Sequence, residues 1–99
     1  MHYALFMRVR VKPEKRDEFI GLITELAANV KANEPETLVW EFLQADDPDE
    51  FVFFECFTDE AACERHQCMD YHLAMSDAGR ACLSEEPHIE VLHGLACGT

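Results

Sequence analysis

The residue of this chain whose type and surroundings most favour proton chemistry is a carboxylate, Glu55. It lies in the segment 51–57, Phe-Val-Phe-Phe-Glu-Cys-Phe, where every other residue is apolar. Burial among apolar groups disfavours the charged form of a carboxylate, and such perturbed groups are typical of general acids and bases. Two interpretations are open: Glu55 transfers protons, or it is a glutamate at the edge of the core that reaches solvent or an arginine.

His66 is the predicted partner of Glu55. Alternate residues of a strand share a face, so Phe53, Glu55 and Phe57 point together. A helix over 59–67 would follow this strand directly and bring His66 near the mouth of a cavity with aromatic walls. A carboxylate and an imidazole in such a place make an acid/base pair, which we take as the predicted catalytic pair. The alternative is a surface histidine on a short helix.

Three further side chains extend the predicted site toward substrate binding. Tyr71 offers an aromatic wall and a hydroxyl for hydrogen bonding. Trp40 either lines the cavity or packs under the helices, and His72 either joins the site or faces solvent. Together with Phe53 and Phe57, these residues form the predicted substrate-binding set.

A metal site is the main competing interpretation of this region. The group Cys63, His66, Cys68 and His72 contains zinc-type ligands, but its spacing fits no familiar structural zinc pattern. A helix would also turn Cys68 away from Cys63 and His66. We therefore predict no metal and a packing role for the small thiols.

The cysteines and the N-terminus bear on the compartment. The cysteine count is odd, no pair has CxxC spacing, and residues 1–8 lack the basic region and long apolar core of an export signal. We therefore expect a cytoplasmic protein with reduced thiols. The cysteines are Cys56, Cys63, Cys68, Cys82 and Cys97.

Composition narrows the class of partner. The 99 residues make one predicted domain, 1–99, with 20 acidic and 8 basic residues and a net charge of −12. This charge argues against binding nucleic acid or an anionic membrane surface. The chain has four glycines and no glycine-rich phosphate loop, so we expect no nucleotide or other cofactor.

Hydrophobic periodicity indicates the elements that position these residues. Residues 3–11 alternate in polarity, which predicts a strand, and an apolar stripe at helical spacing predicts a helix over about 13–32. Residues 37–44 form a second predicted strand. The turn sequence 46–49 joins it to the strand 51–57 in a hairpin.

The second half of the chain predicts two helices and a last strand. Thr58 is the predicted N-cap of the helix over 59–67, and Asp70 of the next one, which ends at 84–87. Residues 88–95 form the last strand. The order β-α-β-β-α-α-β predicts an α+β, ferredoxin-like split βαβ fold with the helices on one face of the sheet.

The strand 51–57 also predicts an assembly. A strand wetted on one face alternates apolar and polar residues, whereas this one is apolar on both. Its helix-free face then needs a cover, and an apolar sheet face marks an interaction surface. We therefore predict a homodimer in which two sheets pack face to face about a two-fold axis.

Two segments carry a resemblance to a known family. Residues 11–19, Val-Lys-Pro-Glu-Lys-Arg-Asp-Glu-Phe, and residues 47–62 resemble the strand-to-helix junction and the hairpin, third strand and following helix of antibiotic biosynthesis monooxygenase (ABM) domains. His66 matches the helix histidine of that family. The resemblance covers nearly the whole chain and implies a dimeric α+β barrel with a cavity between sheet and helices in each subunit.

The resemblance also bears on the site residues. Glu55 and His66 match recurrent positions, and Phe57 stands where a Trp or another aromatic residue is common. Many relatives have a second histidine five residues after the first, where this chain has Tyr71, with His72 one step later. The haem-degrading branch needs an Asn on the first strand and a Trp on the third, both absent here.

Three functions remain after this comparison of motifs. The first is a cofactor-independent monooxygenase of the quinol type, acting on a small aromatic or quinol substrate with dioxygen. The second is an LsrG-like isomerase of a phosphorylated dione, because Met1-His2, the run 55–60 and His93-Gly94-Leu95 look similar to that branch. The phosphate of that substrate is negatively charged, which the net negative charge of this chain disfavours. The third is a non-catalytic module that binds an apolar ligand or serves dimerisation.

Overall fold

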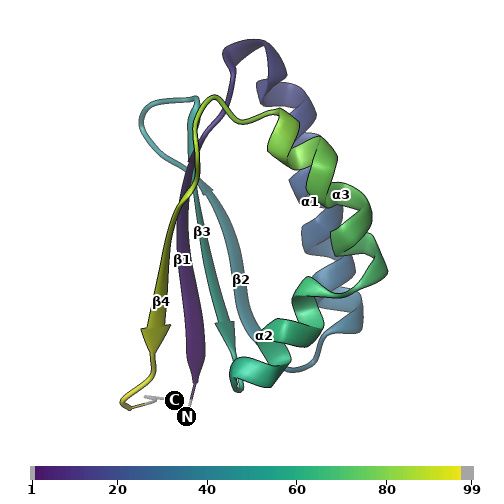
Figure 1. Ribbon diagram of the computed structural model, residues 1–99, viewed down its shortest axis with the longest axis vertical. Coiled ribbons are helices and arrows are strands. Elements are labelled where there is room, and N and C mark those ends of the chain that lie inside the picture. The colour runs from purple at the N-terminus through teal and green to yellow at the C-terminus, as the bar shows by residue number, and fades with distance from the viewer. Residues whose placement is uncertain (1, 97–99) are drawn as a thin grey trace.

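The structure, a computed structural model, describes residues 2–96 and contains a four-stranded sheet with helices on one side (Figure 1). The observed order of strands and α-helices is the predicted β-α-β-β-α-α-β. Cys97, named above among the thiols, lies outside the described residues. The elements are β1 (Tyr3–Arg10), the 3₁₀ turn η1 (Pro13–Lys15), α1 (Arg16–Asn33), β2 (Thr37–Gln44), β3 (Glu50–Phe57), α2 (Glu60–Gln67), α3 (Asp70–Ala81) and β4 (His88–His93).

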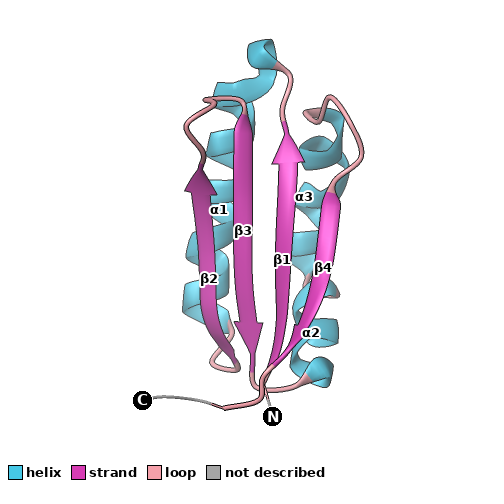
Figure 2. Cartoon of the chain, turned by 90° about the vertical axis from the view of Figure 1, so that its left-hand side faces the viewer, coloured by secondary structure: helices cyan, strands magenta, loops and turns pink. Residues whose placement is uncertain are grey.

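The sheet has the strand order β2-β3-β1-β4, and every neighbouring pair is antiparallel. Figure 2 views the face of the sheet that carries no helix, with all three α-helices behind it. The predicted ferredoxin-like α+β fold is therefore confirmed. No helix within residues 2–96 is long and apolar enough to cross a membrane.

The strand that carries Glu55 is buried on one face within this chain. Phe51, Phe53, Glu55 and Phe57 are buried beneath the helices, whereas the alternate residues of β3 are half-buried on the opposite face. Burial of the helix face is thus confirmed, and burial of the opposite face by a second copy stays a prediction. Glu55 lies between the sheet and the helices of its own chain, and only 5% of it is exposed.

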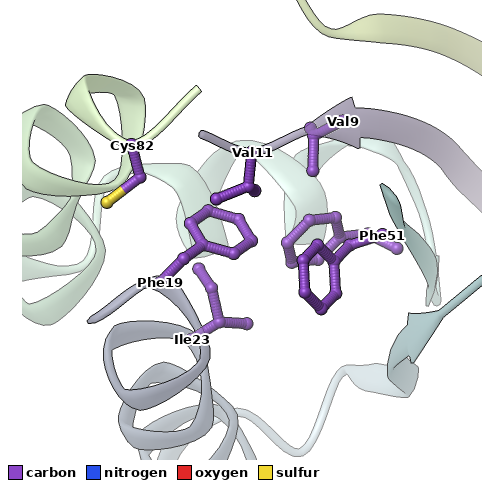
Figure 3. Close-up of a cluster of buried hydrophobic side chains, with 7 residues drawn as sticks. Val9, Val11, Phe19, Ile23, Phe51 and Cys82 are labelled. Atoms are coloured by element: carbon purple, nitrogen blue, oxygen red, sulfur yellow. The ribbon is translucent and has the colours of Figure 1, made fainter. Parts of the chain in front are cut away.

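Two clusters of buried side chains pack the opposite ends of the sheet against the helices. The larger one, at the end where β1 leaves the sheet, is formed by Val9, Val11, Phe19, Ile23, Phe51, Phe53 and Cys82 (Figure 3). Burying each phenylalanine contributes about 1.5–3 kcal/mol. The smaller one joins Phe57 to Ala62 and Cys63 of α2. Between the two clusters lies a cavity, which Ile23 and Phe53 of the larger cluster also line.

Both predicted helix caps are displaced by one residue. Asp59, not Thr58, is the N-cap of α2: its backbone is extended and its carboxylate accepts the Ala62 N–H at 2.8 Å. Thr58 instead donates its backbone N–H to the Glu36 carbonyl, which ties it to the loop before β2. Met69 precedes α3, so Asp70 is the first helical residue, where its charge still favours the helix dipole. The last strand ends at His93 rather than residue 95.

Candidate active site

A cavity of about 500 Å³ lies between the sheet and the helices α1 and α3. Its lining is mainly apolar and includes Leu5 and Met7 of β1, Ile23 of α1 and Phe53 of β3. The lining also includes Ile89 of β4, whose side chain is exposed. This volume suits a small aromatic molecule, because ligand pockets of this kind begin at roughly 300 Å³.

Glu55 and His66 meet at the polar end of this cavity. β3 carries Glu55 and α2 carries His66, and the two side chains are 7% and 2% exposed. His66 Nε2 lies 3.4 Å from Glu55 Oε1, an ion-pair distance. Both residues line the cavity, so a bound molecule would meet a carboxylate and an imidazole together. The interpretation of His66 as a surface residue is wrong.

A second carboxylate, Glu34, holds the other side of the His66 ring. Glu34 follows the last residue of α1, and its Oε1 lies 2.7 Å from His66 Nδ1. Thr37 Oγ1 donates to the same oxygen at 2.8 Å, and the Tyr71 hydroxyl donates to Glu34 Oε2. Sequence reasoning missed Glu34. The available signal was a carboxylate at the predicted end of a helix, just before Pro35.

The two carboxylates set the charge of His66. Burial lowers the pKa of His66, but contact with Glu55 and then with Glu34 outweighs it, so this pKa lies above its ordinary value of 6.5. A neutral imidazole has one N–H, whereas an imidazolium has two. A ring with two N–H groups is the form that serves both Glu34 and Glu55, so the two carboxylates favour the imidazolium form of His66.

His72 favours the neutral form of its ring, in contrast to His66. Its ring packs edge-on against His66 with 4.8 Å between ring centroids, and it lines the cavity. Burial and then the positive charge of His66 lower the pKa of His72. His72 is thus a half-buried, neutral imidazole at the cavity, rather than a solvent-facing side chain. It is a second group able to accept a proton.

The aromatic residues of the predicted site divide into two groups. Trp40 and Phe53 line the cavity, with 5.7 Å between their ring centroids. Phe57 is fully buried and packs against the His66 ring at 5.3 Å, but it lies outside the cavity lining. Tyr71 also lies outside that lining, because its side chain turns toward Glu34 and a smaller hollow between α1 and α3. Phe57 and Tyr71 support His66 and Glu34 instead of forming walls.

The cysteine nearest the site is a packed thiol. Cys63 is buried one helical turn before His66, and burial together with the charge of Glu55 raises the pKa of its thiol to about 11. A thiol in this state is a poor nucleophile and a poor metal ligand. Among residues 2–96, no three His, Cys, Asp or Glu side chains come together as a metal-binding group.

Comparison with known proteins assigns the family. The model of the family described as antibiotic biosynthesis monooxygenase matches residues 2–78, most of the chain. The chain belongs to the ABM family. The resemblance seen in the motifs is thereby confirmed. No curated protein matches this sequence.

Solved structures of similar proteins show the same fold. A Caulobacter crescentus protein that carries the ABM family name in its description is 28% identical, with a TM-score of 0.91 over 96% of this chain and 91% of its own. A Pseudomonas aeruginosa protein is 26% identical, with a TM-score of 0.85 over 96% and 95%. A Mycobacterium tuberculosis protein has a TM-score of 0.91 over the full length of both chains at 18% identity, a likeness of fold alone.

Proposed function

We propose that this protein is a monooxygenase that oxidises a small phenol or quinol with dioxygen and without a cofactor. The bound substrate loses a proton, and the electron-rich anion reacts with O₂ directly. With a phenol, the C–OH and one ring C–H both become C=O. With a quinol, the two C–OH groups become C=O and one ring C–H becomes C–OH. In each case one oxygen atom of O₂ enters the product and the other leaves as water with two hydrogen atoms lost from the substrate. All electrons that reduce O₂ come from the substrate. The observation that carries the proposal is the buried pair of Glu55 and His66 at the end of an apolar cavity.

Each side chain has a defined role in this proposal. Glu55 accepts the proton of the substrate hydroxyl, because His66 already holds its own proton between two carboxylates. The His66 imidazolium then stabilises negative charge beside Glu55. Phe53 and Trp40 hold the substrate ring, and His72 stands beside it as a neutral hydrogen-bonding group. The apolar lining limits water around the reacting anion.

Oxygen uptake with a panel of phenols and quinols tests this function. We expect uptake by the wild type with a subset of the panel, and a loss of 10²-fold or more in kcat for Glu55→Gln. Glu36→Gln is the matched control, because Glu36 pairs with Arg65 on the surface and lies outside the cavity. Equal rates for the wild type and Glu55→Gln would remove Glu55 from the mechanism.

One observation favours a second candidate, isomerisation of a dione that carries an anionic group. Arg80 of α3 lines the cavity, and no carboxylate within residues 2–96 pairs with it, so it is available to a phosphate or carboxylate. Glu55 and His66 would then move protons next to a carbonyl group. Conversion of a phosphorylated dione under anaerobic conditions identifies this activity, whereas stabilisation by ligands without turnover indicates a binding module.

The proposed assembly is a homodimer formed through the helix-free face of the sheet. Strand register places apolar side chains from three strands on this face, among them Phe6, Leu43, Val52 and Phe54. Leu43 is 48% exposed in the single chain. The same register places the charged side chains of Arg8, Glu41 and Glu90 beside these apolar residues. An apolar patch with both charge signs around it is suited to a second copy of itself. Light scattering at micromolar concentration should return twice the 11.4 kDa chain mass, and a monomer would contradict the assembly.

A further inference from the structure

The side chain of Glu34 is bound from three separate segments of the chain. His66 of α2 and Thr37 at the start of β2 donate to its Oε1, and Tyr71 of α3 donates to its Oε2. The Glu34 side chain is only 8% exposed. A carboxylate with this many donors has a fixed position, so the His66 nitrogen that faces it is fixed as well.

The orientation of His66 has a consequence for proton transfer. With Nδ1–H given to Glu34, the remaining nitrogen, Nε2, faces Glu55 at 3.4 Å. Glu34 and Glu55 are both acceptors when ionised, so the arrangement is satisfied only by a ring that carries two N–H groups. A ring of this kind has no free lone pair, and it cannot take a proton from a substrate.

We propose that Glu34 is a positioning residue that keeps His66 as an imidazolium and thereby leaves Glu55 as the group that accepts the substrate proton. Glu34 itself lies outside the cavity lining and acts through His66. The proposal rests on the proposed function only for its catalytic consequence. The charge and orientation of His66 are measurable without any substrate.

The other groups that face His66 agree with this assignment. β3 contributes Glu55 and the uncharged ring of Phe57, and β2 contributes the ring of Trp40. α3 contributes His72, whose pKa is lowered by burial and by the His66 charge. On α2 itself, the Cys63 thiol stays protonated because its pKa is raised. Glu55 and Glu34 are thus the two groups that favour the protonated form of His66. Of the two, only Glu34 lies outside the cavity lining.

NMR titration of the His66 ring tests the proposal, with Glu34→Gln as the main variant. In the wild type, both ring nitrogens of His66 should carry protons at pH 7.5. In Glu34→Gln, the pKa of His66 should fall by about one unit or more, because an opposite charge at this distance shifts a pKa by roughly 1–3 units. Glu36→Gln, two residues along the chain and paired with exposed Arg65, should leave the His66 titration unchanged.

The catalytic readout is the pH profile. Loss of the His66 proton should limit the alkaline side of the kcat profile, and this limb should move to lower pH by the same interval in Glu34→Gln, with KM nearly unchanged. A purely structural role for Glu34 would lower the amount of folded protein without moving the limb.

The NMR titration and the pH profile each have a result that supports the role of Glu34 and one that overturns it. A neutral His66 in the wild type at pH 7.5 overturns the proposal, and this measurement needs no variant, so it holds even if Glu34→Gln does not fold. An unchanged His66 titration in folded Glu34→Gln also overturns it. If no quinol is turned over while the NMR result holds, the oxygenase function fails and the role of Glu34 in fixing His66 stands.

Discussion

The substitution Glu55→Gln has a predicted effect on stability as well as on activity, and the structure gives its size. Gln keeps the volume of the side chain but removes the charge that lies 3.4 Å from His66 Nε2. At an effective dielectric constant of about 20, the gross attraction between charges at this separation is about 5 kcal/mol. Desolvation of both groups offsets much of it. A hydrogen bond to a charged group then contributes roughly 1.5–3 kcal/mol net, which is the expected loss in the free energy of unfolding.

The loss should depend on pH with a definite sign. The folded pKa of His66 is raised above 6.5, so the stabilisation from its charge is fully present below pH 6.5 and is lost as pH rises through the folded pKa. Glu55→Gln should therefore be less stable than the wild type by the full amount at pH 6. Above the folded pKa of His66 the difference should approach zero or change sign, because Glu55 is then buried beside a neutral ring.

Urea unfolding of both proteins at pH 6 and at a pH above the folded pKa of His66 measures this difference. The control is Glu36→Gln, which breaks an exposed ion pair with Arg65 and should cost at most about 1 kcal/mol. Equal stability of the wild type and Glu55→Gln at pH 6 would refute the charged pair. A loss that is the same below and above the pH at which the His66 ring titrates by NMR would refute the assignment of its charge to His66.

Three further predictions follow from single residues. Gly79→Ala places a Cβ 2.7 Å from the flexible Met75 sulfur, which must move within the cavity lining, so KM should rise several-fold with kcat little changed in steady-state kinetics. Tyr71→Phe removes the hydroxyl that donates to Glu34 and should lower the free energy of unfolding in urea by about 1 kcal/mol, with the apolar cavity wall intact. No change would mean that water in the unfolded chain satisfies this hydroxyl as well as Glu34 does. Leu43→Asp introduces a charge on the helix-free sheet face and should convert the dimer to a monomer in light scattering, whereas a dimer unaffected by it would place the interface elsewhere.

The sequence predicted the fold because the local signals agree with one another. Alternation in 3–11, the hairpin turn at 46–49 and the three predicted helices all appear in the structure with small changes at their ends. The one-residue errors at the caps have a simple cause. Thr58 and Asp59 are both good N-caps, and the choice between them depends on the contact of Thr58 with the loop before β2.

The central pair of the site was predictable because one strand and the short helix after it carry the two residues. Glu55 and His66 come from adjacent elements, so their meeting follows from the parity of the strand and the start of α2. Glu34 comes from the end of α1, 32 residues before His66, and its role exists only after α1, β2 and α3 have packed together. Tyr71 was predicted to form a cavity wall, because the sequence does not show which group the hydroxyl of a tyrosine at the start of a helix contacts.

Isotope labelling tests whether Glu55 removes the substrate proton and whether the resulting anion reacts with dioxygen in this cavity. The protein is mixed anaerobically with a quinol that it binds and is then exposed to ¹⁸O₂ in ordinary water, and the product is analysed by mass spectrometry. We expect one ¹⁸O atom in the hydroxyquinone product and a second in water, with the yield lost in Glu55→Gln. A product without label, or one that forms equally well before oxygen is admitted, would contradict it.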